Sequence, residues 1–410
     1  MKIIVYEHVS GGGYAAKQIS PSILSEGFGM LRKIVSDFKL AGHEVTVLLD
    51  QRLSNLTPPL NANCIVPVSN SEEPKKFLVS LAKNNDAIYV IAPETGKTLQ
   101  SLVEIVEQTD KISLNCESSA IQKVADKTVL CEVLEKNCLA TPKTMVFDIN
   151  DNLSEIKCSI KSELTYPLVF KPVDGTSCCA LSIVKQESQV NDAISKLKAE
   201  SANQHFIVQE FIEGEAASVS LLCEKGEARA ISLNQQNVEI CTPDGISSYK
   251  GGVIPFDHRL KQGAFRVSEK AAECFPGLRG YVGVDLILSR DKPFVVDVNP
   301  RLTTSFVGLS QTAKFNVAEE IVKAVLKGNL HADSENNGYV YFSKYETCKP
   351  TNNAFQTIAQ MKEVVSPPFP LSDSQKACAL ISAHGDSLEN AKEKLEEAKK
   401  HVLSIISRGN

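Results

Sequence analysis

The 410-residue sequence lacks a surplus of basic residues, a CxxC pair and any apolar stretch long enough to span a membrane. Its formal net charge is −5, so it has no basic footprint of the kind that nucleic-acid-binding proteins carry. The twelve cysteines are scattered, with no zinc-type spacing. No segment approaches the ~18 consecutive apolar residues that a transmembrane helix needs. We therefore expect neither a nucleic acid nor a membrane as partner.

The start of the sequence gives no indication of a targeting segment. Residues 1–7 (MKIIVYE) lack the basic region, the longer apolar stretch and the cleavage site of a secretory signal, and predict a strand instead. A disulfide framework is not expected at this length, so the cysteines are interpreted as reduced thiols of a cytoplasmic protein. The length predicts two or three globular domains.

Residues 1–115 alternate strands and helices, which is typical of a parallel sheet with helices on its faces. The strands are expected at residues 2–6, 45–49 and 87–91, and the helices at residues 23–40, 77–83 and 99–107. The predicted N-terminal domain is therefore a βαβ unit of α/β class.

Residues 116–330 contain many short strands and few helices, which predicts an α+β domain built on antiparallel sheet. The one helix expected at its start covers residues 120–135, and the strands fall at 141–147, 167–172, 180–184, 207–212, 217–223, 228–233, 282–288 and 294–298. Residues 331–410 form a smaller α/β extension. It begins with a polar linker at 331–338 and has strands at 338–342 and 377–383 and a charged amphipathic helix at 387–408.

The strongest chemical pattern is a group of oxygen-bearing side chains on two predicted strands. Alternation along residues 295–299 (VVDVN) places Asp297 and Asn299 on one face, with Val296 and Val298 directed into the core. Asp285, on the neighbouring strand, can supply a third oxygen ligand. Such a set suits Mg²⁺, which takes few protein oxygens and completes its shell with phosphate and water. The alternative is a solvated polar sheet face.

Two lysines are candidates for phosphate contacts. Lys171 ends a predicted strand and precedes residues 173–179 (VDGTSCC), a segment of mostly small residues that includes Gly175 and Ser177 and could close backbone N–H groups over phosphate. Lys127 stands at a helix start. A simple Lys-Pro turn and an ordinary surface lysine are the alternatives.

A candidate adenine site follows another strand. Residues 208–214 (VQEFIEG) change from apolar to polar just before a glycine, which could present backbone groups to an adenine edge; a plain strand exit is the alternative. Residues 96–98 (GKT) look like the end of a P-loop, but Ile91 occupies the position where that motif requires glycine. We interpret them as a turn.

The order of these motifs resembles the ATP-grasp family over roughly residues 115–325. The resemblance implies an ATP-grasp fold with a Rossmann-like pre-ATP-grasp domain before it, an α/β plus α+β architecture followed by the small C-terminal domain. It also implies ATP as cofactor and one or two Mg²⁺ ions, with Mn²⁺ as an alternative, bound by Asp285, Asp297 and Asn299. The implied nucleotide-binding residues are Lys127, Lys171, Gly175, Ser177, Gln209, Glu210, Phe211, Ile212 and Glu213, and the implied catalytic residues are Arg301 and Lys171.

Three positions depart from the family pattern. Cys178 and Cys179 stand where glycines are common, and Ala216 aligns near a glutamate that often meets the ribose, so that Glu213 or Glu215 would substitute. One metal position that is often Glu is Asp297 here.

Within the family, the chain is most similar to the tyramine–glutamate ligase branch of methanofuran synthesis. The residues that carry this likeness are 24–31 (LSEGFGML), 92–95 (APET), 232–236 (SLNQQ), 249–253 (YKGGV) and 299–305 (NPRLTTS). The likeness implies that a carboxylate, such as glutamate, is activated as an acyl phosphate and joined to an amine. Residues after 330 lie outside it.

The acceptor site is predicted from the ends of strands and helices. The candidates are Glu7, Ser10, Gly11, Glu26, Tyr249 and Lys250. Ligands of open parallel sheets gather beyond the carboxyl ends of strands, and Glu26 could meet an ammonium group. The glycine run at 11–13 could be a flexible turn, and residues 249–252 either a substrate lid or a surface hairpin. A catalytically silent nucleotide-binding module and a homo-oligomer stay open, whereas the glycines at 11–13 do not form a dinucleotide fingerprint.

Overall fold

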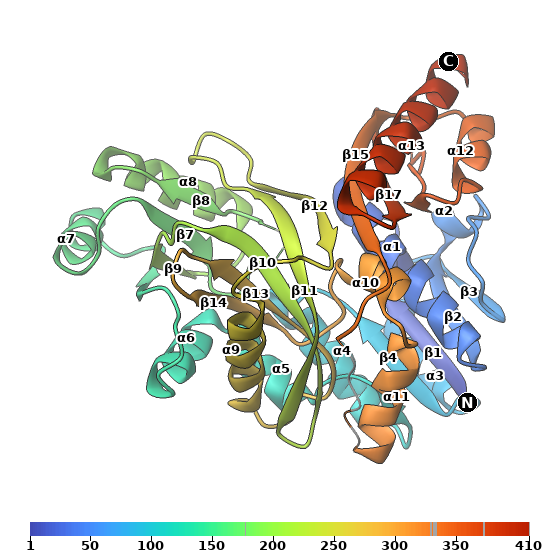
Figure 1. Ribbon diagram of the computed structural model, residues 1–410, viewed down its shortest axis with the longest axis horizontal. Helices are drawn as coiled ribbons and strands as arrows, with labels where there is room; N and C mark the ends of the chain where they lie inside the picture. The colour runs from blue at the N-terminus through green and yellow to red at the C-terminus, as the bar shows by residue number, and fades with distance from the viewer. Residues whose placement is uncertain (177, 329, 331–333, 372–373, 410) are drawn as a thin grey trace.

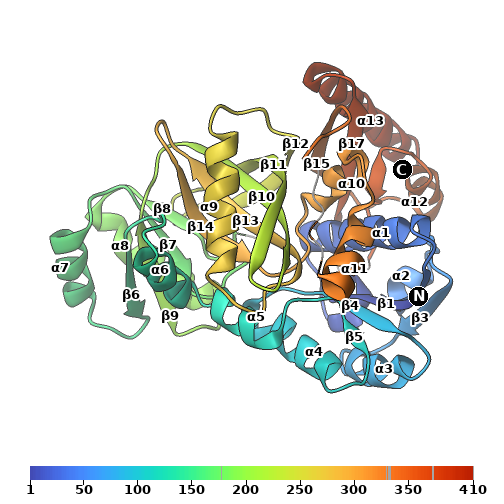
Figure 2. The ribbon, with the colours of Figure 1, turned by 60° about the horizontal axis from the view of Figure 1, so that its bottom comes forward.

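The computed structural model describes residues 1–176, 178–328, 330, 334–371 and 374–409, and these form three β-sheets with flanking helices. The N-terminal sheet and the four-stranded sheet lie at opposite ends of the molecule, with the large sheet between them (Figures 1 and 2). No helix in the described ranges is long and apolar enough to cross a membrane.

The N-terminal domain has a five-stranded parallel sheet in the order β3-β2-β1-β4-β5. Ile3 and Val5 of β1 pack in the same core as α1, whereas Ile4 and Tyr6 share a core with α3 and α4, so the sheet is buried on both faces. This confirms the predicted parallel sheet. Its elements are β1 Lys2–Glu7, α1 Pro21–Leu40, β2 Glu44–Asp50, α2 Gln51–Ser54, β3 Cys64–Val68, α3 Glu73–Ala82, β4 Ala87–Ile91, α4 Thr98–Glu107 and β5 Ile112–Ser113.

The small lobe is a four-stranded antiparallel sheet in the order β6-β9-β7-β8. Phe147, Phe170 and Phe206 stack in its core, with ring centroids 5.7 and 6.0 Å apart. Its elements, with the two helices that precede it and a short helical turn at Glu187–Gln189, are α5 Ser118–Ala125, α6 Lys127–Lys136, β6 Thr144–Asp148, α7 Leu153–Glu163, β7 Leu168–Pro172, β8 Ser182–Val184, α8 Val190–Glu200 and β9 His205–Glu210.

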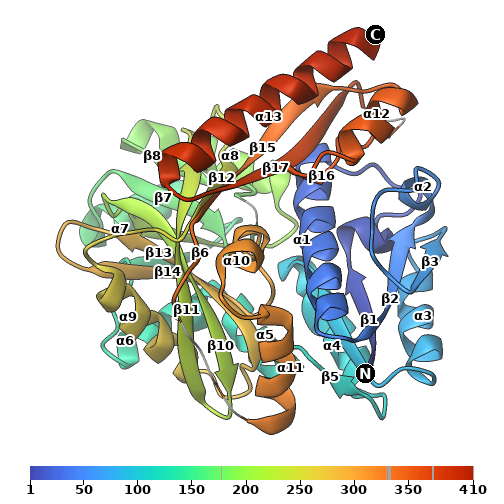
Figure 3. The same cartoon turned by 45° about the vertical axis from the view of Figure 1, so that its right-hand side comes forward.

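The large sheet is antiparallel and has eight strands in the order β14-β13-β10-β11-β12-β15-β17-β16. It is continuous across the boundary expected near residue 330, because β12 pairs with β15. Helices α1 and α13 both pack against β17, as Figure 3 shows. Its elements are β10 Glu215–Glu224, β11 Glu227–Glu239, β12 Ser248–Ile254, α9 Lys261–Glu273, β13 Gly280–Leu288, β14 Pro293–Asn299, α10 Phe306–Thr312, α11 Val317–Lys327, β15 Tyr339–Cys348, α12 Asn352–Ala359, β16 Val364–Ser366, β17 Lys376–Gly385 and α13 Leu388–Gly409. Residues 331–333 of the expected linker lie outside the described residues.

Two expected elements differ in the structure. The single helix expected at residues 120–135 is broken at Asp126, whose extended backbone ends α5 and whose carboxylate accepts from the N–H of Thr128 at 2.9 Å. Aspartate at this position caps a new helix more favourably than it continues an old one. Residues 249–252, expected as a lid or a surface hairpin, lie within β12 in the middle of the large sheet.

Candidate active site

A cavity of about 860 Å³ lies where the three sheets meet, and most of the predicted site residues line it. The N-terminal domain contributes Glu7, Glu26 and the segment after β4, and α6 contributes Lys127. The small lobe contributes Lys171, Gly175 and residues 209–212. The large sheet and the segment after it contribute Tyr249, Asp285, Asp297, Asn299 and Arg301. Residues more than 200 positions apart in the sequence therefore share one site.

The two carboxylates of the predicted metal site face each other on adjacent strands. Asp285 of β13 is paired in register with Asp297 of β14, and the Asn299 Nδ2 donates to Asp285 Oδ2 at 3.0 Å. The Gln236 Nε2 donates to Asp285 Oδ1 at 2.9 Å. Burial, and then the charge of Asp297, raise the pKa of Asp285 to about 6. A bound cation would relieve the repulsion between these two like charges.

The alternation expected along β14 is wrong at Val296. The pairing register shifts between Asp285 and Leu286. Asp297 pairs with Asp285 and Val295 pairs with Leu286, which leaves Val296 as the extra residue of a β-bulge. Val295 and Val298 are consequently the core residues, whereas Val296 lines the cavity. The bulge still leaves both carboxylates at the site.

The chemistry of this donor set fits Mg²⁺. Two carboxylates and the amide oxygen of Asn299 offer hard oxygen ligands, because the amide nitrogen is the atom turned to Asp285. Among the described residues, no group of three or more His, Cys, Asp or Glu side chains could hold a metal by itself. Two carboxylates and one amide oxygen suit an ion that takes its remaining ligands from phosphate and water.

Both predicted lysines lie inside the site. Lys127 is buried, not a surface lysine, and its Nζ lies 2.8 Å from Asp297 Oδ2. Burial alone would lower the pKa of Lys127, but the carboxylates of Asp297, Glu94 and Asp285 together raise it above its usual value. The Lys171 Nζ donates to the Val296 carbonyl at 3.3 Å, and burial and the nearby Lys127 lower its pKa. Two ammonium groups thus meet beside the two carboxylates.

Arg301 has a partner that sequence reasoning did not assign. The Arg301 Nη2 donates to Glu94 Oε2 at 3.0 Å, and its Nε lies 2.9 Å from Glu94 Oε1. Glu94 follows β4, at the carboxyl end of a parallel strand where ligands of such sheets gather. That position was the signal that could have identified it. Glu94 opposes the effect of burial and raises the pKa of Arg301.

The loop after Lys171 is tied to the N-terminal domain. The Thr95 Oγ1 donates to the Asp174 carbonyl at 3.0 Å, and the Gly96 N–H donates to Asp174 Oδ2 at 3.0 Å. Gly96 and Lys97 have positive φ in a short helical turn, Thr95–Lys97, and Thr98 begins α4, in agreement with the rejection of residues 96–98 as a P-loop. Gly175 lines the cavity, whereas Ser177 lies outside the described residues.

The predicted adenine segment is only partly on the cavity wall. Gln209, Glu210, Phe211 and Ile212 line it, but Glu213 does not, whereas Glu215 does. Of the two glutamates left open for the ribose, Glu215 is therefore the one on the cavity wall. The Gln209 side chain is turned away to Thr144, to which its Nε2 donates at 2.8 Å.

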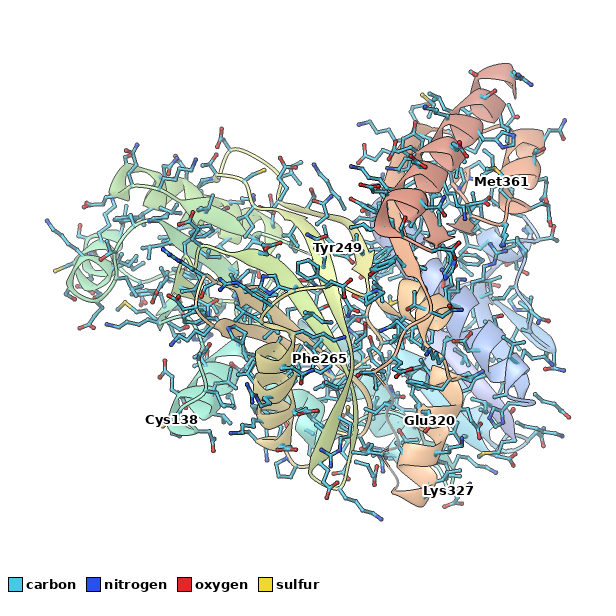
Figure 4. All side chains as sticks on the ribbon, in the orientation of Figure 1. Cys138, Tyr249, Phe265, Glu320, Lys327 and Met361 are labelled. Atoms are coloured by element: carbon cyan, nitrogen blue, oxygen red, sulfur yellow. The ribbon has the colours of Figure 1, made fainter. Side chains whose placement is uncertain are left out.

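The predicted acceptor residues separate into two groups. Glu7, Glu26 and Tyr249 line the cavity, and Figure 4 shows Tyr249 where the large sheet meets the N- and C-terminal parts. Ser10, Gly11 and Lys250 are not on its wall, contrary to expectation. The reasons differ for the three residues.

The residues outside the wall have structural partners. The Ser10 hydroxyl and N–H both donate to Glu7 Oε2, at 2.6 and 2.7 Å, and this holds Glu7 in place. A Cβ on Gly11 would lie 2.7 Å from the Tyr6 ring, so that the glycine permits close packing in a short helical turn, Val9–Gly13. Lys250 pairs with Glu239 in solvent, because adjacent residues of a strand point to opposite faces.

Comparisons with known proteins match two family models to consecutive stretches of the chain. An ATP-grasp domain matches residues 124–305 and a pre ATP-grasp 3 domain matches residues 43–121. The chain is 29% identical over 323 residues to a tyramine–L-glutamate ligase of Methanocaldococcus jannaschii, covering 78% of this chain and 88% of that protein.

Solved structures agree with the fold. An ATP-grasp superfamily protein from Archaeoglobus fulgidus is similar with a TM-score of 0.62 at 24% identity, covering 93% of this chain and 99% of that one. N5-carboxyaminoimidazole synthetase from Staphylococcus aureus, solved with ADP, has a TM-score of 0.68 at 11% identity, covering 97% and 96%. The predicted fold class is confirmed.

Proposed function

The chain belongs to the ATP-grasp ligases, and from that premise we propose that it uses ATP to join a carboxylate to an amine through an acyl phosphate. The observation that carries the proposal is the meeting of Asp285, Asp297 and Asn299 with Lys127, Lys171 and Arg301 in one cavity. Its charges suit a reaction in which an anion attacks a polyanion.

The first step is transfer of the γ-phosphoryl group to the substrate carboxylate, which releases ADP. Lys127 and Lys171 would bind phosphate oxygens and reduce the repulsion between the two anions. Mg²⁺ held by Asp285, Asp297 and Asn299 would supply further positive charge at the transferring group.

The second step is attack of the amine on the acyl phosphate, which forms the amide and releases phosphate. Arg301 would stabilise the negative oxygen of the tetrahedral intermediate, and its ion pair with Glu94 keeps the guanidinium oriented. The loop held by Thr95 and Gly96 would exclude water from the acyl phosphate, which water would otherwise hydrolyse.

Glutamate and an amine with an apolar body are the substrates that we propose. The M. jannaschii relative is named for tyramine and L-glutamate. The part of the cavity beside α1 and β4 is lined by apolar side chains, which suits an arylalkyl amine. These are Val9, Tyr14, Ile23, Met30 and Ile91.

Measuring ADP release with L-glutamate and tyramine, with mass detection of the product, tests this proposal. We expect ADP and a product with the mass of the amide, both dependent on Mg²⁺. A panel of other carboxylates and amines separates the ligase assignment from the particular substrates. ATP binding without ADP release from any pair would favour the alternative, a silent nucleotide-binding module.

A further inference from the structure

Glu26, on the wall of the cavity, is paired with Lys344 of the C-terminal extension. The Lys344 Nζ lies 2.6 Å from Glu26 Oε1, although the two residues are 318 positions apart in the chain. The side chains are 13% and 10% exposed. The mechanism above uses neither of them, so the pair needs its own explanation.

The pair has a polar and aromatic frame. The Thr304 hydroxyl donates to the other Glu26 oxygen at 2.8 Å, and Lys344 also donates to the Ser22 hydroxyl at 2.9 Å. The Lys344 ammonium lies 5.6 Å from the centre of the Tyr249 ring. Both charges are therefore held in fixed positions.

The pair is not needed to attach the C-terminal extension. Helix α1 already contacts β17, and its Arg32 donates to the carbonyls of Val364 and Val365 at 2.8 and 3.2 Å. A largely buried ion pair contributes little to stability, because desolvation offsets the attraction. Its position beside the reaction site is a better guide to its role.

The pair is connected to the reacting groups. Glu26, Tyr249 and Thr304 line the cavity, and Thr304 belongs to the same segment as Arg301. Cys178, on the loop after Lys171, also lines the cavity. Burial is the main cause that raises the pKa of its thiol, and smaller effects come from Glu26, which raises it, and Lys344, which lowers it. A ligand at the pair would therefore lie between the loop and the arginine segment.

We propose that Glu26 and Lys344 bind the head group of an α-amino acid, with the substrate ammonium on Glu26 and its α-carboxylate on Lys344. The two charges of such a head group are attached to one carbon and match a neighbouring anion and cation. The Glu26–Lys344 pair and the head group each have a net charge of zero, so that binding leaves no unpaired charge buried. This inference rests on the proposed ligase function, because it assigns the side-chain carboxylate to the activation site.

Equilibrium binding tests the assignment independently of turnover. Calorimetry on the full chain would compare L-glutamate with 4-aminobutyrate, which lacks the α-carboxylate, and with glutarate, which lacks the ammonium. We expect the wild type to bind L-glutamate ~10-fold or more tightly than either analogue, as expected for losing a charged hydrogen bond. Lys344→Met should remove the preference over 4-aminobutyrate, and Glu26→Gln the preference over glutarate.

Two controls separate recognition from folding. Lys344→Arg keeps the cation and should keep the preference for L-glutamate over 4-aminobutyrate. Lys376→Met removes a cation of the neighbouring strand β17 that pairs with Glu346 in solvent, and it should change none of the three affinities. Thermal unfolding of each variant confirms that it is folded.

The outcomes distinguish the two proposals. Equal weakening of all three ligands in Lys344→Met and Glu26→Gln, or a wild type that does not prefer L-glutamate, would overturn the head-group assignment. ADP release from L-glutamate and an amine would leave the ligase proposal intact in that case. If the protein prefers L-glutamate over both analogues but releases no ADP with any carboxylate and amine, the head-group assignment stands and the ligase proposal is wrong.

Discussion

Arg301, on the wall of the cavity, forms an ion pair with Glu94, 207 residues away in the sequence and contributed by a different domain. The Glu94 side chain is 6% exposed and that of Arg301 14%. The arginine that is proposed to meet the reacting oxygen is therefore oriented by the N-terminal domain. Its position depends on how the first 115 residues dock on the rest.

The ion pair can be tested with Glu94→Gln. Removing one partner leaves the guanidinium buried without its counter-charge, so we expect about 3–5 kcal/mol lower unfolding free energy, together with slower ADP release. Urea unfolding measures the first effect. Glu163→Gln, which breaks the exposed pair with Lys143, is the matched control and should leave stability nearly unchanged. Equal stability of the two variants would contradict the buried ion pair.

The metal site can be tested with Asp297→Asn. Loss of one oxygen anion should reduce kcat/KM by about 10²–10³-fold, as for other groups that stabilise charge in a transition state, and raise the Mg²⁺ concentration that half-saturates the enzyme. Titration of ADP release with Mg²⁺ measures both effects. Asp291→Asn, in the exposed turn of the same β13–β14 hairpin, should behave as wild type. An unchanged Mg²⁺ titration in Asp297→Asn would remove Asp297 from the ligand set.

The loop contact predicts a specific loss of ATP affinity. Asp174→Ala removes the acceptor of the Gly96 N–H, and one hydrogen bond of ~0.5–1.5 kcal/mol corresponds to a rise of about 2- to 12-fold in the KM for ATP. Steady-state kinetics at saturating second substrates measure it. Asp192→Ala on the exposed face of α8 is the control. A rise of the same size in both variants would show that the contact is not responsible.

Asp37 predicts how stability changes with pH. It is buried in α1, and burial raises its pKa to about 7 from 3.8, while Lys33 opposes this. Because the folded state holds the proton more tightly, the contribution of Asp37 is greatest below pH ~4. That contribution falls as pH rises to about 7, by at most ~1.4 kcal/mol per pH unit.

Asp37→Asn provides the measurement for this pH effect. Denaturant unfolding of wild type and variant between pH 4 and 8 should show the variant gaining stability relative to wild type as pH rises, with the difference levelling above pH ~7. Asp86→Asn, whose carboxylate accepts from the exposed Lys2 N–H, is a control with no buried carboxyl. A difference that stays constant with pH would contradict the raised pKa of Asp37.

The sequence was informative where a local pattern carried the information. The parallel sheet follows from apolar strands that alternate with helices, and Asp285 and Asp297 were placed together because the strands that bear them are consecutive. Helices α7, α8 and α9 were not predicted, since each is short and rich in charged residues. Helix α11 was missed although seven of its eleven residues are apolar.

Contacts between distant segments could not be predicted in the same way. Neither the Glu94–Arg301 pair nor the Glu26–Lys344 pair has a local pattern, because each joins residues that only tertiary packing brings together. The bulge at Val296 depends on how β14 pairs with β13, which strand alternation alone does not specify. The residue types of the site were therefore easier to predict than the contacts between them.

The continuous eight-stranded sheet determines which strand is left at its C-terminal edge. If the chain stopped near residue 330, β12 would present a row of unpaired backbone N–H and C=O groups, which is a template for pairing with another polypeptide. The extension moves that outer edge to β16, a strand of three residues followed at once by Pro367 and Pro368, which offers little for a foreign strand to pair with. The C-terminal part thus pairs the backbone groups of β12, so that this strand is not open to another polypeptide, whatever the effect of the extension on substrates.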